Sequence, residues 1–140
     1  MNREYQFLDS AVHQVSENHF PRELEERLIG FAVSIIKISN KLPKTRAGNH
    51  IGGQLVRSGT APALIYGEAQ YAESRKDFIH KMKIALKELR ETMVSLKIIH
   101  KASLLNTNEI IDSLIPENDE LISIFVKSVL TAQKNLNKDE

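Results

Sequence analysis

Apolar residues spaced alternately three and four positions apart constrain this chain more than any other feature. Between residues 21 and 42 the residues that follow this spacing are Leu24, Leu28, Phe31, Ile35, Ile38 and Leu42. The pattern places them on one face of an α-helix, close to the seam of a coiled coil. The sequence therefore predicts a helix from Pro21 to about Lys41, and Pro43 prevents its extension because proline disfavours helical geometry at the preceding residue.

The segment from Arg46 to Ala72 is rich in glycine and alanine, yet it is also expected to be helical. Each glycine costs about 1 kcal/mol against alanine in a helix. The alternative is a loop of more than about 20 residues, which is rarer inside a small domain. Small residues would instead allow a neighbouring helix to approach closely.

The third helix has the clearest start signal. Ser74-Arg75-Lys76-Asp77 fits the capping-box pattern, with Asp in the place of the usual Glu. The predicted helix runs from there to about Lys101, and one apolar line follows it. That line consists of Ile79, Met82, Leu86, Leu89, Met93 and Leu96.

A short helix from Glu109 to Leu114 is expected to end before Pro116, and a fourth long helix to run from about Glu117 to Leu136. Four long helices, short connections and no strand pattern predict an all-α, up-and-down antiparallel four-helix bundle over residues 21–140. Residues 1–20 form an N-terminal leader, in which Tyr5, Leu8 and Val12 allow a short helix.

Composition narrows the possible functions. The chain has 140 residues, 41% of them hydrophobic and 26% charged, which is typical of one soluble domain. It has no cysteine, which excludes disulfides and thiolate chemistry. No signal peptide or membrane-spanning run is evident, so we expect a cytoplasmic protein that does not bind membranes.

Motifs for catalysis and metal binding are missing from the sequence. A di-iron bundle needs paired Glu-x-x-His motifs, and the nearest match is a single Asp77-x-x-His80. Neither a G-x-S-x-G nucleophile elbow nor a phosphate-binding glycine loop is present. We therefore expect no catalytic residues, no metal, no cofactor and no enzymatic activity.

Basic residues concentrate in the middle of the chain. Residues 27–101 contain fourteen basic and five acidic residues, whereas the segments on either side are acidic. On the third helix the basic residues recur at heptad spacing and form a basic ridge, which we define as Lys76, His80, Lys83, Lys87, Arg90, Lys97 and Lys101. At 1.5 Å per residue this ridge is roughly 35–40 Å long.

Two interpretations of the basic ridge remain open. A row of cations can follow a phosphate backbone, which would make Lys76, Lys83, Lys87, Arg90, Lys97 and Lys101 candidate nucleic-acid-binding residues. Alternatively, it is a solvated face, or it pairs with acidic segments of a neighbouring subunit. The first and third predicted helices also have wider apolar stripes than one core requires, which indicates a homo-oligomer.

Several runs of sequence resemble a known family. They are Leu55-Val56-Arg57-Ser58-Gly59-Thr60, Glu68-Ala69, and Glu73-Ser74-Arg75-Lys76-Asp77-Phe78. Together they resemble the bacterial four-helix-bundle proteins first noticed in intervening sequences of 23S ribosomal RNA genes. The resemblance covers about residues 25–105.

The resemblance implies a bundle without established enzymatic activity that assembles as a ring-like homopentamer. A related branch serves as accessory protein to retroelement reverse transcriptases and binds nucleic acid. Arg57 and Glu68 match charged positions of the family, and together with Ser74 and Asp77 we expect them to be structural or interfacial. An oligomeric adaptor that binds a protein partner, with no nucleic-acid role, is the alternative function.

Overall fold

The computed structural model describes residues 20–139, which contain four α-helices and no β-strand. Helix α2 covers Phe20–Lys41, α3 covers Arg46–Ala69, α4 covers Arg75–Lys101 and α5 covers Glu109–Asp139. The all-α prediction is thereby confirmed. The leader was predicted over residues 1–20; residues 1–19 lie outside the described residues, and Phe20 belongs to α2.

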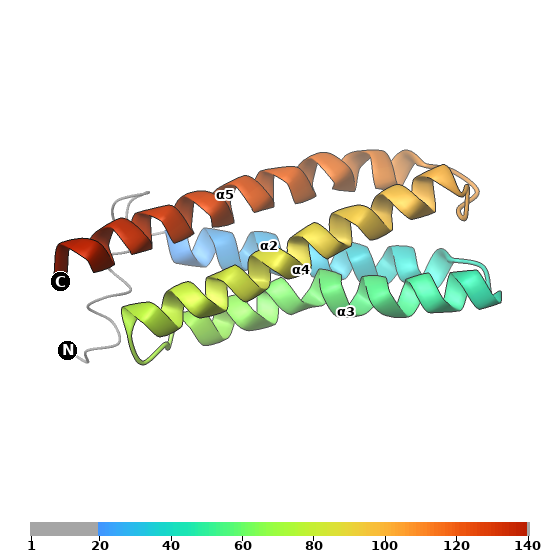
Figure 1. The fold of residues 1–140 in the computed structure, drawn as a ribbon. Helices are drawn as coiled ribbons and strands as arrows, with labels where there is room; N and C mark the ends of the chain where they lie inside the picture. The colour runs from blue at the N-terminus through green and yellow to red at the C-terminus, as the bar shows by residue number, and fades with distance from the viewer. Residues whose placement is uncertain (1–19, 140) are drawn as a thin grey trace.

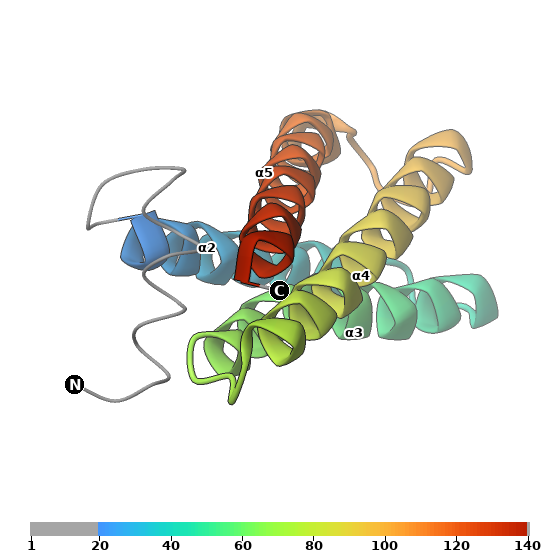
Figure 2. The same cartoon turned by 60° about the vertical axis from the view of Figure 1, so that its left-hand side comes forward.

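The helices alternate in direction, so that α2 and α4 run one way and α3 and α5 the other (Figure 1). Each helix packs on the one that follows it in sequence, whereas α2 and α5 share few contacts. Figure 2 shows α4 lying between α3 and α5, with its outer side turned away from α2. Arg27 of α2 bridges to α5, where it forms ion pairs with Glu117 and Glu120.

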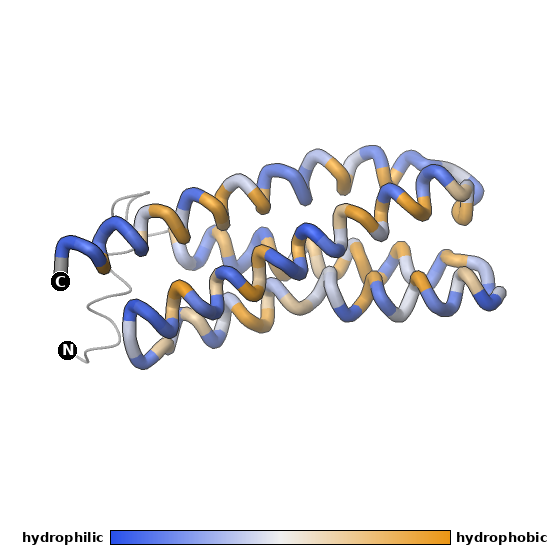
Figure 3. The backbone as a smooth tube through the Cα atoms, viewed as in Figure 1, coloured by the Kyte–Doolittle hydropathy of each residue, from blue (hydrophilic) through white to orange (hydrophobic). Residues whose placement is uncertain are grey.

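The core is formed by the apolar stripes predicted from sequence. Along each helix, short hydrophobic and hydrophilic stretches recur with about the period of a helical turn (Figure 3). Tyr66 of α3 and Phe125 of α5 meet edge to face in the core, with ring centroids 6.1 Å apart. Such an edge-to-face contact between aromatic rings contributes about 1 kcal/mol of stability beyond that from burying the two rings.

The glycines of α3 explain how a helix of low propensity is stabilised. Gly59 is buried against α2, and a Cβ atom there would lie 2.7 Å from Ile35 Cγ2. At Gly48 a Cβ atom would collide with the carbonyl oxygen of Pro43. Only glycine permits these approaches, so the tertiary packing of α3 offsets its weak intrinsic propensity.

Helix α5 corrects the prediction of a break before Pro116. The structure has a single helix from Glu109 to Asp139 that contains Pro116. Proline removes one helical hydrogen bond, but Pro116 is exposed, so water can satisfy the carbonyl left unpaired. The buried face continues across it through Leu114, Asn118 and Leu121.

Two buried polar contacts connect α4 to its neighbours. The hydroxyl oxygens of Ser58 and Thr92 lie 2.9 Å apart between α3 and α4. The side-chain amide of Asn118, on α5, lies 3.1 Å from both the Leu89 carbonyl oxygen and the Met93 amide nitrogen. With its nitrogen toward the carbonyl, Asn118 donates to Leu89 and accepts from Met93, so its burial leaves no polar group unpaired.

Candidate nucleic-acid interface

Helix α4 positions the basic ridge, and its start is set by Ser74. The Ser74 hydroxyl accepts a hydrogen bond from the Asp77 amide at 3.0 Å, and the Asp77 carboxylate accepts one from the Glu73 amide at 3.2 Å. This local cap satisfies backbone donors at the helix start and begins α4 at Arg75. Ser74 and Asp77 thus form the cap at the start of α4.

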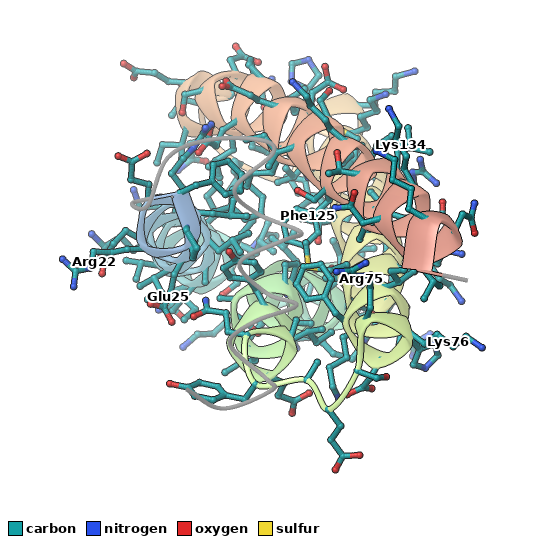
Figure 4. The ribbon with its side chains drawn as sticks, turned by 90° about the vertical axis from the view of Figure 1, so that its left-hand side faces the viewer. Arg22, Glu25, Arg75, Lys76, Phe125 and Lys134 are labelled. Atoms are coloured by element: carbon teal, nitrogen blue, oxygen red, sulfur yellow. The ribbon has the colours of Figure 1, made fainter. Side chains whose placement is uncertain are left out.

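All seven residues of the basic ridge are exposed on α4. Figure 4, a view from one end of the bundle, shows Lys76 pointing away from the bundle on the side opposite Arg22 of α2. The row is interrupted once, by the exposed Val94. Heptad spacing places Lys76, Lys83, Arg90 and Lys97 about 10.5 Å apart along the helix.

The carboxylates of α4 do not neutralise the ridge. Glu88 and Glu91 both pair with Arg57 of α3, and the Glu88 contact is 2.9 Å long. Asp77 lies 3.9 Å from Lys81, which faces α3. Among the described residues no carboxylate forms an ion pair with any lysine or arginine of the ridge.

Arg57 and Glu68 lie on the side of α3 that faces α4. The hydrogen bond from Arg57 to Glu91, with the charge of Glu88, raises the pKa of the guanidinium. Glu68 lies 3.8 Å from the Lys81 ammonium nitrogen. These ion pairs join α3 to α4 within the chain, and they hold the acidic groups on the flank of α4 away from the ridge.

A hollow of about 350 Å³ lies between α4 and α5, directly beside the ridge. We call it the α4–α5 groove, and it is lined by Lys83, Leu86, Lys87, Arg90, Val126, Val129 and Leu130. One wall is cationic and belongs to the ridge, and the other is apolar. Leu130 is 61% exposed although it is a large hydrophobic residue.

Sequence reasoning missed the apolar wall of this groove. The signal was present, because Phe125, Val126, Val129 and Leu130 place apolar side chains on two sides of α5. Phe125 and Val129 are buried in the core and Val126 packs partly buried against it, whereas Leu130 is exposed. A second hollow of about 550 Å³ lies between α2 and α3, and its lining includes Lys44, Arg57 and three glycines, of which only Gly53 is exposed.

Two features are absent from the part of the chain that the structure describes. No three His, Asp or Glu side chains within it come together in a way that could hold a metal ion. No helix in residues 20–139 is both long and apolar enough to cross a bilayer.

Comparison with known proteins decides the family. The model of the 23S rRNA-intervening sequence proteins matches residues 23–127, which span α2, α3, α4 and most of α5. The chain belongs to this family. A comparison with curated protein sequences finds no match.

A solved structure has the same fold as this 23S rRNA-intervening sequence protein. It is the 1.70 Å crystal structure of a protein of unknown function from the S23 ribosomal protein family of Bacteroides thetaiotaomicron. The two chains are 28% identical, with a TM-score of 0.71 over 78% of this chain and 96% of the other. The family resemblance inferred from Leu55–Thr60 and the Ser74 region is thus confirmed.

Proposed function

We propose that this protein is a non-enzymatic, homo-oligomeric bundle that binds RNA or DNA weakly through the basic ridge. One observation carries the proposal: a row of exposed cations on α4 that no described carboxylate neutralises. The nearby carboxylates of Glu88 and Glu91 form ion pairs with Arg57 instead of with cations of that face. The ridge therefore presents positive charge to solvent along most of the helix.

Binding of this kind is electrostatic and independent of base sequence. Each phosphate neutralised by a lysine or arginine releases condensed counterions, so affinity falls with salt. Six contacts on duplex DNA would give a slope of about −5 in a plot of log affinity against log salt. The ridge contains no phenylalanine or tyrosine, so base stacking does not contribute.

Assembly with further copies of the chain would strengthen this weak binding. Helix α2 exposes Ile29, Val33 and Ile36, which recur at helical spacing on its outer side and are each about 43–44% exposed. A contiguous apolar face of this kind favours a protein–protein contact. A ring of five, as the family resemblance implies, would repeat the ridge and raise avidity without any new contact.

An oligomeric adaptor that binds a protein partner is the second candidate. It is favoured by the formal net charge of only +1 and by Leu64 and Tyr71 of the α3 side, which are 70% and 62% exposed. Under this hypothesis the cations of α4 are solvated and have no ligand. The two candidates differ in whether nucleic acid binds at low salt.

A salt titration of labelled RNA and DNA duplexes of equal length tests the proposal. We expect the wild type to bind both at about 50 mM salt and to lose affinity steeply above it. The substitutions Lys83→Glu and Lys87→Glu together should abolish binding, since both side chains are exposed and the helix should stay folded.

The matched control makes the same change of charge away from both α4 and the apolar face of α2. Lys44→Glu and Arg46→Glu, both exposed where α2 is connected to α3, should leave most of the affinity intact. Absence of binding by the wild type at about 50 mM salt would exclude the nucleic-acid function and favour the adaptor. Equal binding by both double variants would show that α4 is not the site.

A further inference from the structure

The α4–α5 groove combines two chemistries that a nucleic acid does not use together. Lys83, Lys87 and Arg90 form a cationic wall, and Leu130 is part of the apolar wall opposite. Phosphates would occupy the first wall and leave the second exposed to water. A peptide segment with apolar residues on one side and carboxylates beside them would cover both walls.

The chain itself contains a segment of that composition. In residues 1–19 the apolar residues Tyr5, Leu8 and Val12 recur at helical spacing. Three carboxylates, those of Glu4, Asp9 and Glu17, accompany a single basic residue, Arg3. The segment is therefore amphipathic and net acidic, which is complementary to a groove that is half apolar and half cationic.

The distances along the chain allow residues 1–19 to reach the groove. Helix α2 begins at the end of the bundle where α4 begins and α5 ends (Figures 1 and 2). Lys83 is eight residues into α4 and Leu130 is nine residues before the end of α5, so the groove starts about 12 Å from that end. Nineteen extended residues span up to about 60 Å, which is enough to pass around the bundle.

We propose that residues 1–19 bind in the α4–α5 groove of their own chain, with their apolar side against Val126, Val129 and Leu130 and their carboxylates against Lys83, Lys87 and Arg90. The groove is thus an interaction surface for an acidic amphipathic segment. The apolar contact gives most of the binding free energy, because exposed ion pairs contribute little. The carboxylates select the cationic wall.

This docking has a consequence that rests on the proposed function. Three cations of the ridge would be covered by residues 1–19, so the segment would compete with nucleic acid for Lys83, Lys87 and Arg90. The lysines of the ridge outside the groove, Lys76, Lys97 and Lys101, would remain available. Weak binding by the intact chain would then reflect internal competition as well as the small number of charges.

Docking is measured without nucleic acid, on the full-length protein. Because the chain has no cysteine, Ser10→Cys and Ser123→Cys supply two unique sites for spin labels, the second on the exposed side of α5 next to the groove. Pulsed electron paramagnetic resonance should show one narrow, short distance between the two labels. That distance should persist when labelled protein is diluted with unlabelled protein, because the contact is within one chain.

Two groove variants and their matched controls test the site. Leu130→Ser, and separately Lys83→Glu with Arg90→Glu, should broaden the distance distribution and shift it to longer values. Two control variants should leave the distribution narrow. They are Leu64→Ser, which changes a leucine of α3 that is also largely exposed, and Lys76→Glu with Lys97→Glu, which changes ridge cations outside the groove. A broad distribution in the wild type, loss of the short distance on dilution, or insensitivity to both groove variants would overturn the proposal.

Competition is measured separately, with the labelled RNA duplex at about 50 mM salt. Leu130→Ser changes no charge, so any gain in affinity reflects release of residues 1–19. We expect a gain of about tenfold, equivalent to 1.4 kcal/mol at 25 °C. Unchanged affinity would overturn the competition. If neither the wild type nor Leu130→Ser binds RNA, the proposed function fails. The distance measurement still determines whether residues 1–19 bind in the groove.

Discussion

Gly59 of α3 and Ile35 of α2 lie so close together that a Cβ atom at position 59 would come within 2.7 Å of Ile35 Cγ2. Both residues are buried, so neither helix can yield easily. We expect Gly59→Ala to lower the free energy of unfolding, measured with denaturant, by about 1–3 kcal/mol through overpacking.

Gly53→Ala is the control. That position has open space, so the variant should gain about 0.5–1 kcal/mol from better helix propensity. Equal effects of the two substitutions would contradict the packing observed here.

Ser74 caps α4, and its removal should weaken the whole ridge-bearing helix. Ser74→Ala removes the hydrogen bond from the Asp77 amide and should lower the free energy of unfolding by about 1 kcal/mol. Ser113→Ala, an exposed serine of α5 whose hydroxyl bonds to the Ile110 carbonyl, should have little effect. An unchanged melting curve for Ser74→Ala would mean that the cap is not required.

The amide of Asn118 should be irreplaceable by a carboxylate of the same shape. In Asn118→Asp a buried carboxylate would face the Leu89 carbonyl oxygen. Both groups are hydrogen-bond acceptors, so no hydrogen bond could form between them and they would repel each other. We expect this variant to be at least about 2 kcal/mol less stable than Asn118→Leu at neutral pH. Asn118→Leu is the matched comparison because it removes the polar group and leaves the helical hydrogen bonds of α4 intact. Equal stability of the two would show that the amide contact is absent.

Tyr66 makes the stability of the fold sensitive to alkaline pH. Its hydroxyl is buried with no hydrogen-bond partner among the described residues, and burial, with a smaller effect of Glu25, raises its pKa above the usual 10.0. Below pH 10 both folded and unfolded chains keep the proton, so this residue contributes no pH dependence. Above pH 10 the unfolded chain ionises first, and stability falls by up to about 1.4 kcal/mol per pH unit.

Tyr66→Phe isolates this effect. At pH 7 the variant should be as stable as the wild type or more stable, since it removes an unpaired buried hydroxyl. Above pH 10 its advantage should grow as the wild type loses stability. Urea unfolding at pH 7 and pH 10.5 measures both, and a constant difference would show that Tyr66 does not titrate in this range.

The apolar stripe of α2 should determine assembly. Replacing Ile29, Val33 and Ile36 with serine removes exposed apolar surface without opening the core. Light scattering should then give the 15.9 kDa monomer at micromolar concentrations, while the wild type gives a larger particle. The control Leu130→Ser should keep the wild-type mass. A monomeric wild type would contradict the homo-oligomeric part of the proposed function.

Local signals predicted most of the fold. The start of α4 followed from the Ser74 to Asp77 pattern, and the buried faces followed from apolar spacing. The break before Pro116 was wrong because the effect of a proline depends on whether water can reach the freed carbonyl, which the sequence does not reveal. The exposure of the ridge was predictable from heptad spacing, since residues seven apart share a face.

Other parts of the candidate site depend on contacts between distant segments. The pairing of Arg57 with Glu88 and Glu91 joins residues more than thirty positions apart, and no local pattern indicates it. The α4–α5 groove likewise lies between two helices that are distant in sequence, with Leu86 of α4 and Val129 of α5 both part of its lining. Sequence placed the cations on one face, but only the fold shows what lies beside them.

Asn118 also limits how this bundle can move. Its amide contacts the Leu89 carbonyl oxygen and the Met93 amide nitrogen of α4, so sliding α5 along α4 by part of a helical turn, whose pitch is about 5.4 Å, would break both hydrogen bonds. An unpaired amide in the core costs about 1–3 kcal/mol, a large part of the stability of a small domain. We therefore expect that binding of a ligand to the ridge does not cause α4 to slide along α5. Any mechanical response would have to be a rotation or tilt of the two helices as a locked pair.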